Sequence, residues 1–267
     1  MLRRSMIALT LSLCASLGNS AAAQTKPDYQ AIIQQAKQGN AEAQNNLGVM
    51  YGKGYGVTQN KAKARQWYEK AAENGHAGAQ FNLGTIYYQG NGVPQDYEKA
   101  LHWYLKAAAQ GDEDAQYNLG LMFTFGKGAP QNYSNAYYWY KKAADKGLAP
   151  AQANLGTMYA NGHSVHQNYA VARIWYERAA AQGDADGQYN LGTIYADGNG
   201  VPVDYKKARQ WYEKAAAQGH PHALLGLGNM YANGHGVRKN HAKAKEWFAK
   251  SCDEGLQDGC DAHRSLK

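Results

Sequence analysis

Apolar and polar positions repeat along this chain with a period of 36 residues. The unit is clearest over residues 77–112, which read AGAQFNLGTIYYQGNGVPQDYEKALHWYLKAAAQGD. Apolar residues recur three and four positions apart in two stretches of the unit, and this spacing predicts two amphipathic helices joined by a loop. A fixed period of this length is typical of a solenoid, in which each unit buries its apolar side against its neighbours. Six units follow one another without insertions, at 41–76, 77–112, 113–148, 149–184, 185–220 and 221–256.

The ends of the predicted helices carry their own signals. The first helix has the pattern A-x-x-N-L-G-x-[MI]-[YF], and a glycine such as Gly90 follows it, as suits the left-handed residue that ends a helix. A loop G-x-G-V-x-x-[ND] then leads to Asp96 or its equivalent, whose side chain can accept the free amides of the second helix. That helix has the pattern A-x-x-W-[YF]-x-[KR]-[AS]-[AC] and stops at a further glycine.

All six tryptophans occupy one position of the unit, and tyrosine follows five of them while Phe248 follows the sixth. A bulky ring at a strict period predicts one structural socket between stacked helix pairs. The tryptophans are Trp67, Trp103, Trp139, Trp175, Trp211 and Trp247. A glycine in the middle of each first helix, such as Gly84, costs about 1 kcal/mol relative to alanine, so we expect a close approach of two helices there.

These motifs closely resemble the Sel1-like repeat family, relatives of tetratricopeptide repeats with a longer loop between helices. The resemblance covers residues 41–256. It implies an all-α fold, a right-handed α-solenoid of six Sel1-like helix-turn-helix repeats, used as an adaptor or regulator through protein binding. Its bacterial members include periplasmic regulators of signalling, assembly factors of envelope complexes, host-interaction factors and immunity proteins that neutralise secreted toxins. Leu224, Gly226 and Ser164 depart from the family pattern without changing the predicted fold.

Incomplete units flank the six repeats. Residues 24–40 have helical spacing and a glycine stop, and they predict an N-terminal capping helix. Residues 257–267 begin a further first helix that is never completed, which predicts a C-terminal capping helix. Capped ends argue against end-to-end polymerisation.

Residues 1–23 have the features of a secretory signal peptide. Arg3 and Arg4 precede an apolar stretch, and three alanines ending at Ala23 offer a cleavage site. The apolar run is too short to span a bilayer, and no later stretch approaches the roughly 20 apolar residues required. We therefore expect a periplasmic or secreted protein without stable membrane insertion. Cys14 leaves lipidation as an alternative, although the leucine before it does not suit that modification.

Removal of the signal leaves Cys252 and Cys260, and an even count in an exported chain favours a disulfide bond. A bond that closes such a short loop would stabilise the fold by about 2.5 kcal/mol in the chain-entropy model. A zinc pair or a redox site is the alternative, but further ligands and the C-x-x-C spacing are lacking. The spacing also resembles the disulfide of cysteine-rich members of the family.

The formal charge is +7 and is spread along the chain, without a block of Lys or Arg. This distribution does not favour nucleic acid as a partner. The cation of each second helix, such as Lys106, is expected on a solvated face.

Candidate chemistry is sparse. The glycine loops lack the preceding strand and the third glycine of a dinucleotide site. Two histidine pairs, His163 with His166 and His220 with His222, have no thiol or carboxylate converging on them in sequence, so solvated loop histidines are favoured over metal ligands. There is no S-x-x-K or G-x-S-x-G motif. We predict no catalytic residue, metal or cofactor. Some cysteine-rich relatives bind or slowly hydrolyse β-lactams, and that function is the alternative.

Specificity is expected where the units differ. If the first helices line the concave surface, as in the tetratricopeptide relatives, aromatic and apolar residues concentrate there in the second and third units. The predicted partner-binding residues are Phe81, Tyr88, Tyr117, Leu121, Phe125 and Tyr189. Aromatic residues on a face without packing partners are typical of interface hot spots. The alternative is that some of them pack against the next helix. We predict an adaptor, regulator or immunity protein that binds another protein of unknown identity in this groove.

Overall fold

A computed structural model describes residues 29–266 of the chain. Over this range the chain forms fourteen α-helices and no strand, as predicted. The predicted signal peptide lies outside the described residues. The helices are α1 (Tyr29–Lys37), α2 (Ala41–Lys53), α3 (Lys61–Glu73), α4 (Ala77–Gln89), α5 (Tyr97–Ala109), α6 (Glu113–Phe125), α7 (Tyr133–Asp145), α8 (Ala149–Asn161), α9 (Tyr169–Ala181), α10 (Ala185–Asp197), α11 (Tyr205–Ala216), α12 (Pro221–Asn233), α13 (His241–Asp253) and α14 (Gln257–Ser265).

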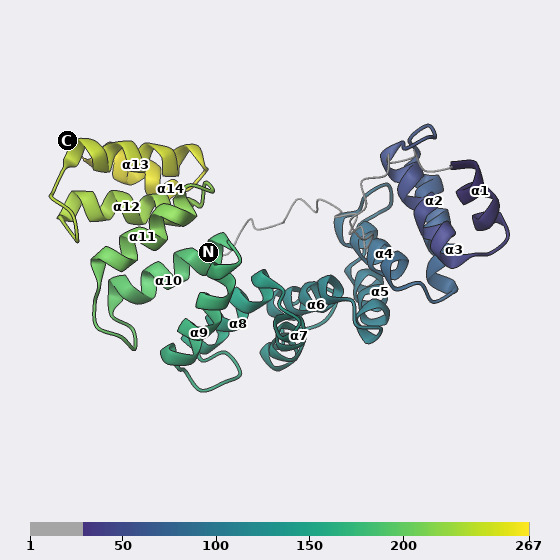
Figure 1. Cartoon of the computed structure of the whole chain (residues 1–267), viewed down its shortest axis with the longest axis horizontal. Helices are drawn as coiled ribbons and strands as arrows, with labels where there is room; N and C mark the ends of the chain where they lie inside the picture. The colour runs from purple at the N-terminus through teal and green to yellow at the C-terminus, as the bar shows by residue number, and fades with distance from the viewer. Residues whose placement is uncertain (1–28, 267) are drawn as a thin grey trace, which may run out of the picture.

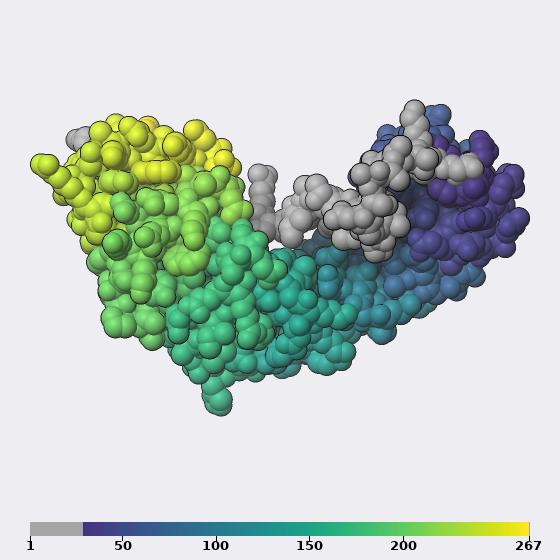
Figure 2. All heavy atoms as spheres, viewed as in Figure 1, coloured from purple at the N-terminus to yellow at the C-terminus, as the bar shows by residue number. Residues whose placement is uncertain are grey.

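The helices form an all-α solenoid. Each unit contributes one hairpin, from α2–α3 to α12–α13, and successive hairpins stack into an arc with α1 at one end and α13 and α14 at the other (Figure 1). In the middle of the arc, α4, α6 and α8 lie on its inner side and α5, α7 and α9 on its outer side. Figure 2 shows the molecule hollowed on that inner side. We call the first helices of the six units the inner layer and the second helices the outer layer, after this arrangement in the middle of the arc.

Local capping sets the ends of these helices. Gly90 ends α4 in the left-handed conformation, with φ of 69°, and its amide donates to the carbonyl of Ile86. Asp96 begins α5, where its carboxylate accepts the amide of Lys99 at 2.9 Å. Ser164 occupies one of these left-handed loop positions, with φ of 62°, and among the described residues it is the one non-glycine residue that does so.

The tyrosine that follows each tryptophan forms the centre of each hairpin. Tyr104 of α5 is buried, and its ring lies against the backbone of Gly84 in α4. A Cβ atom added to Gly84 would lie 2.5 Å from Cδ1 of this ring. This contact confirms that the glycine in the middle of the first helix allows a close approach. The same pairing recurs in every unit, with Phe248 in place of tyrosine in the sixth.

The tryptophan rings lie at the junctions between units. Trp103 packs against the core that α3 and α4 share, so its indole bridges the first and second hairpins. Trp175 is buried, whereas the other five rings are half-buried. A cation three residues further along the same helix lies over each ring, as Lys106 Nζ does at 4.6 Å from the centre of the Trp103 ring. These cations are Lys70, Lys106, Lys142, Arg178, Lys214 and Lys250.

A ladder of glutamine side chains also joins successive units. Nε2 of Gln80 donates to the carbonyl of Ala72 in the preceding unit, and its Oε1 accepts a hydrogen bond of 2.8 Å from Nε2 of Gln110. The third unit breaks the pattern because Lys146 stands in place of that second glutamine. Lys146 donates to the carbonyl of Gly111. Oε1 of Gln116 is left buried and without a hydrogen-bond partner.

The C-terminal cap packs on the last hairpin. Cys252 of α13 and Cys260 of α14 form a disulfide bond, with their Cα atoms 4.5 Å apart. Beside it, Gly259 is buried against Ser251, whose hydroxyl donates to the carbonyl of Pro221 at 2.9 Å. The short helix α14 thus closes the apolar end of the sixth unit.

Candidate functional site: the inner surface

The side chains of the six first helices that face the hollow of the arc form what we call the inner surface (Figure 2). Sequence analysis assigned six partner-binding residues to it, on α4, α6 and α10. The structure divides them into two buried residues, three half-buried residues and one exposed residue.

The two buried residues are Phe81 and Tyr117, with exposed fractions of 6% and 8%. The prediction that they face an open groove is wrong. Phe81 packs against Ala115 and Leu119 of α6, the first helix of the next unit, and its ring lies 5.7 Å from that of Tyr104. Stacking rotates each unit relative to the last, so the following first helix covers this position of the helix before it.

Tyr117 has the same environment one unit later. It packs in a cluster with Ala151 and Leu155 of α8, and its ring lies 6.0 Å from that of Tyr140. Burial raises the pKa of Tyr117 well above the ordinary value for a tyrosine. The side chain is therefore a neutral part of the core.

The other four predicted residues keep part of their side chains accessible. Phe125 ends α6 with 44% of its surface exposed, and Leu121, half-buried, precedes it by one turn on the same side of the helix. Tyr88 of α4 is half-buried, with its ring 5.2 Å from Tyr97 in an edge-to-face contact, and burial raises its pKa. Tyr189 lies further along on α10. These four residues are the accessible apolar part of the predicted set.

Tyr189 belongs to a cluster that sequence analysis did not find. Its ring stacks on that of His220 at 4.7 Å, and Nε2 of His220 lies 3.0 Å from Oδ1 of Asp186. Nδ1 of His220 accepts the amide of Ala223, so this histidine is the N-cap of α12. Because Nδ1 is an acceptor, the proton is on Nε2 and is donated to Asp186.

His76 repeats this arrangement at the start of α4, where it accepts the amide of Ala79 and contacts Glu42 at 2.7 Å. The sequence signal that could have revealed these caps is the position of the two histidines within the repeat. Both histidines stand where Asn40 and Asp112 cap other first helices. His220 is thus a helix cap that joins two units, not a solvated loop residue.

The remaining histidines of the two pairs have different surroundings, and the ring of His222 lies 6.1 Å from that of His220. His163 stacks on Tyr133 at 4.3 Å, and His166 is exposed. Burial lowers the pKa of His222, and the nearby His220 lowers it further. Between residues 29 and 266, no three His, Cys, Asp or Glu side chains are grouped as a metal site requires.

Formal charge differs between the two layers. The first helices of the six units carry five Asp or Glu and one Lys, a formal charge of −4. The second helices carry seventeen Lys or Arg and eight Asp or Glu, a formal charge of +9. The positive net charge of the chain therefore belongs to the outer layer, and the inner layer is acidic.

The acidic groups gather at the start of α6 and α10. Asp112 and Asp184 cap these helices through hydrogen bonds of 2.7 Å to the amides of Ala115 and Gly187. Burial raises the pKa of both carboxyls, and burial and the nearby Asp112 raise that of Asp114. Within the part of the chain described, no Lys, Arg or His lies within 4.0 Å of these three carboxylates. The inner layer thus combines accessible apolar side chains with carboxylates, three of which form no ion pair within 4.0 Å among the described residues.

A family model for the Sel1 repeat matches residues 41–76, 77–112, 113–148, 149–184, 185–220 and 221–256. The chain belongs to the Sel1 repeat family.

Solved structures with the same repeat agree with this assignment. The Sel1 repeat protein is 36% identical to c5321, a protective antigen of uropathogenic Escherichia coli with an SLR fold, at a TM-score of 0.79 over 89% of this chain and 52% of that one. It therefore spans about half the length of that antigen. A Sel1 repeat protein from Oxalobacter formigenes is 36% identical at a TM-score of 0.78, over 86% of this chain and 93% of that one.

A more distant structure shares only the fold. The immunity protein PA5088 from Pseudomonas aeruginosa is 23% identical at a TM-score of 0.52, over 81% of this chain and 83% of that one. Among curated proteins, no match to this Sel1 repeat protein was found. In the described part of the chain, every helix is too short or too polar to cross a membrane.

Proposed function

We propose that this Sel1 repeat protein is an exported scaffold that binds a segment of another protein on its inner surface. The observation that carries the proposal is the difference between the two layers. The difference is one of charge: the inner layer is acidic and the outer layer is basic, while accessible apolar side chains occur on both, Tyr88, Leu121, Phe125 and Tyr189 on the inner layer and Leu105, Tyr138 and Ile174 on the outer layer. A surface of this kind complements a partner segment that combines cationic and apolar side chains.

The packing of the scaffold supports this role. A side-chain N-cap hydrogen bond begins every helix of the two layers except α8, and the ring of a tyrosine or phenylalanine fills each hairpin. A preformed surface loses little conformational entropy on binding, so that more of the contact energy contributes to affinity. Accessible apolar side chains such as Phe125 are available without unfolding any part of the core.

Three roles fit such a scaffold: a periplasmic adaptor, a regulator, and an immunity protein that neutralises a toxin. All three depend on capture of a partner protein, and the fold that the chain shares with an immunity protein is compatible with each. Export rests on the sequence pattern of residues 1–23 and on the disulfide bond between Cys252 and Cys260, a bond typical of oxidising compartments.

A matched pair of double variants tests the proposal. Asp114 is the second residue of α6 and Phe125 is its last residue. The inner variant combines Asp114→Lys with Phe125→Ser. In the outer layer, Glu98 is the second residue of α5 and Leu105 of the same helix is 38% exposed. The outer variant combines Glu98→Lys with Leu105→Ser, so both variants make the same change of charge and remove one exposed apolar side chain.

Tagged full-length chains are used to capture partners from an envelope extract, and the captured proteins are identified by mass spectrometry. We expect one partner to be captured by the wild type and by the outer variant and to be lost with the inner variant, while the unfolding midpoints of all three stay close. With the purified partner, affinity should fall as salt rises, because opposite charges attract one another across the interface. A partner that is retained by the inner variant and lost with the outer one would overturn the proposal.

A further inference from the structure

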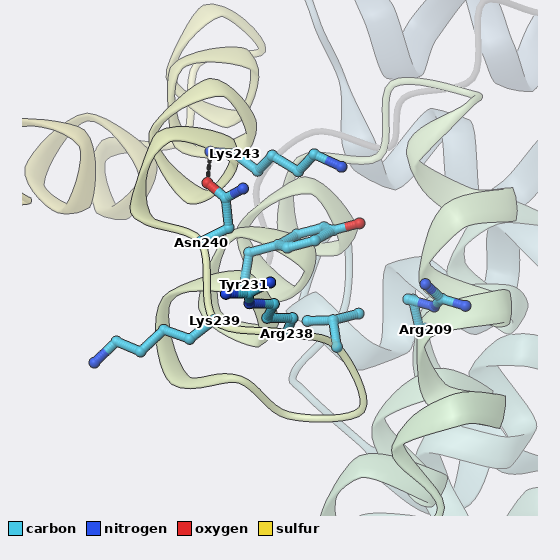
Figure 3. A pocket seen from close by; sticks show the side chains of 7 residues that line it. Arg209, Tyr231, Arg238, Lys239, Asn240 and Lys243 are labelled. Atoms are coloured by element: carbon cyan, nitrogen blue, oxygen red, sulfur yellow. Dashed lines mark hydrogen bonds between the residues drawn. The ribbon is translucent and has the colours of Figure 1, made fainter.

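A second candidate site lies in the last two units, away from the residues of the inner surface. The loop between α12 and α13 forms, together with α11, a pocket of about 550 Å³ (Figure 3). Four of its seven lining residues are cationic, and none is acidic. The cations come from three elements: Arg209 from α11, Arg238 and Lys239 from the loop, and Lys243 from α13.

In two other units the lysine at the position of Lys243 is paired with an acidic N-cap residue, whereas in the first unit Lys63 follows the neutral N-cap Asn60. In the second unit, Lys99 pairs with the N-cap residue Asp96 at 3.0 Å, and in the fifth unit Lys207 pairs with Asp204 at 3.5 Å. Lys243 occupies the same position in the sixth unit, but the N-cap there is the neutral Asn240. The charge of Lys243 is therefore not cancelled by the start of its own helix.

The loop of the sixth unit also lacks a hydrogen bond that the loops of the first four units form. In the first unit, Nε2 of Gln59 donates to the carbonyl of Gly52 at 2.9 Å, and the second, third and fourth units repeat this bond. Lys239 stands at this position in the sixth unit, and Arg238 stands where the first unit has Thr58. The sixth loop thus carries two cations in place of a neutral pair that holds the loop to its helix.

Arg209 leaves a donor unused. Its Nε is buried without a hydrogen-bond partner and lies 3.7 Å from Oε1 of Glu213, beyond hydrogen-bond distance. Nε of Arg173, at the same position of the fourth unit, is likewise buried without a partner. However, Arg65 and Arg173 each form a hydrogen bond through Nη1 with the glutamate four residues further along, and no such bond is formed by Arg209. The guanidinium of Arg209 is therefore less fully paired than its equivalents.

Two of the lining donors, the hydroxyl of Tyr231 and the amine of Lys243, extend to the same side of the pocket. In Figure 3 this is the side on which Arg209 lies, while Lys239 extends away from it. An arginine fork and an ammonium group together bind a tetrahedral oxyanion, because the charge and the several oxygens of the anion match these donors. We propose that this pocket binds the phosphate group of an anionic ligand.

The repeat itself supplies a variant that should fold. The double change Arg238→Thr and Lys239→Gln gives the sixth loop the residues that the first unit has at these positions, Thr58 and Gln59. A second variant, Arg209→Leu, places in α11 the residue that α5 has at the same position, Leu101. The control is Lys53→Gln with Lys206→Gln, which removes two exposed charges outside the pocket.

The probes are inorganic phosphate and pyrophosphate, measured by calorimetric titration of the full chain, and vesicles of phosphatidylglycerol and phosphatidylcholine in equal parts, measured by flotation. We expect saturable binding by the wild type and by the control, and at least about tenfold weaker binding by both pocket variants, because each loses a charge-assisted hydrogen bond. Binding of the soluble anions would indicate a soluble phosphorylated ligand, and pocket-dependent binding of vesicles alone would indicate a lipid headgroup.

Two results would overturn the proposal. One is that the wild type binds neither the soluble anions nor the vesicles in a saturable way. The other is that the wild type and the pocket variants bind equally well. Unfolding midpoints of the variants are measured in parallel, so that a loss of binding is compared between folded proteins. The test is independent of partner capture by the inner surface, because it measures phosphate and vesicle binding and neither pocket variant changes a residue of a first helix.

Discussion

The ring of Tyr140 lies so close to the backbone of Gly120 that a Cβ atom added to the glycine would be 2.4 Å from Cδ1 of the ring. The ring and the glycine belong to the two helices of one hairpin, so this contact sets how closely the hairpin closes. A glycine within a helix is otherwise unfavourable. Its presence here is explained by the aromatic ring that occupies the space of a side chain.

Substitution of Gly120 by alanine tests this contact. The added methyl group would force Tyr140 or the helix to move, at a cost of about 1–3 kcal/mol, and the better helix propensity of alanine returns only about 1 kcal/mol. We expect a net loss of unfolding free energy in urea. Gly52→Ala is the matched control, because a Cβ there would meet its nearest neighbour at 3.7 Å. That variant should be as stable as the wild type or more stable, and a loss at Gly52 equal to that at Gly120 would contradict this account.

The gap in the glutamine ladder predicts a stabilising change. Lys146→Gln would provide the donor that Oε1 of Gln116 lacks and would keep the bond to Gly111, as Gln110 does for Gly75. A hydrogen bond to a buried acceptor contributes about 1 kcal/mol, so the unfolding free energy should rise by that order. The reverse change, Gln110→Lys in the second unit, should lower it. A chemical denaturation series on both variants is the measurement. A lower unfolding free energy for Lys146→Gln, or a higher one for Gln110→Lys, would refute the role of the ladder.

Two N-cap carboxylates should respond to pH in opposite directions. Burial raises the pKa of Asp112 above its ordinary value of 3.8, so this carboxyl favours the folded state below that value and loses that contribution as the pH rises through the folded pKa. Asparagine caps a helix about as well as aspartate. We therefore expect Asp112→Asn to be more stable than the wild type at neutral pH and the difference to vanish in acid.

Asp96 is the control for this experiment. Hydrogen bonds from the amide and the side chain of Lys99 lower its pKa, so its contribution is present above 3.8 and is lost as the pH falls through the lower folded pKa. Asp96→Asn should therefore be less stable than the wild type at neutral pH. The unfolding free energies of both variants are measured from neutral to acidic pH. As the pH falls, that of Asp112→Asn should approach the wild-type value from above and that of Asp96→Asn from below. The same sign at both positions would show that burial does not govern Asp112.

The disulfide bond between Cys252 and Cys260 predicts a response to reductant. It closes a loop of eight residues in sequence separation, and such a short loop contributes about 2.5 kcal/mol in the chain-entropy model. Reduction should lower the unfolding midpoint and loosen α14 before the rest of the solenoid. Hydrogen exchange in α14, compared with α6, is the measurement. A Cys252→Ala, Cys260→Ala variant should be insensitive to reductant, and the same sensitivity in that variant would exclude the bond as the cause.

The solenoid and its helix ends could be predicted because their causes are local. Gly90 ends α4 and Asp96 begins α5 through hydrogen bonds to residues three or four positions away. The 36-residue period then repeats these local capping interactions in each unit. Similarly, the position of the glycine in the first helix indicates a close approach, although the tyrosine that makes it lies about twenty residues further along the chain, as with Gly84 and Tyr104.

The accessible surface depended on the way one unit stacks on the next. Phe81 and Tyr88 are aromatic residues of the same helix, yet α6 covers the first and leaves the second half-exposed. Likewise, the pocket joins Arg209 to Lys243, which belong to different units. By itself, the sequence determined the repeat and the ends of its helices, because those follow from local hydrogen bonding and apolar spacing. Only the tertiary structure decided which residues remain accessible and which charges converge, because the rotation between units is set by the packing of many side chains at once.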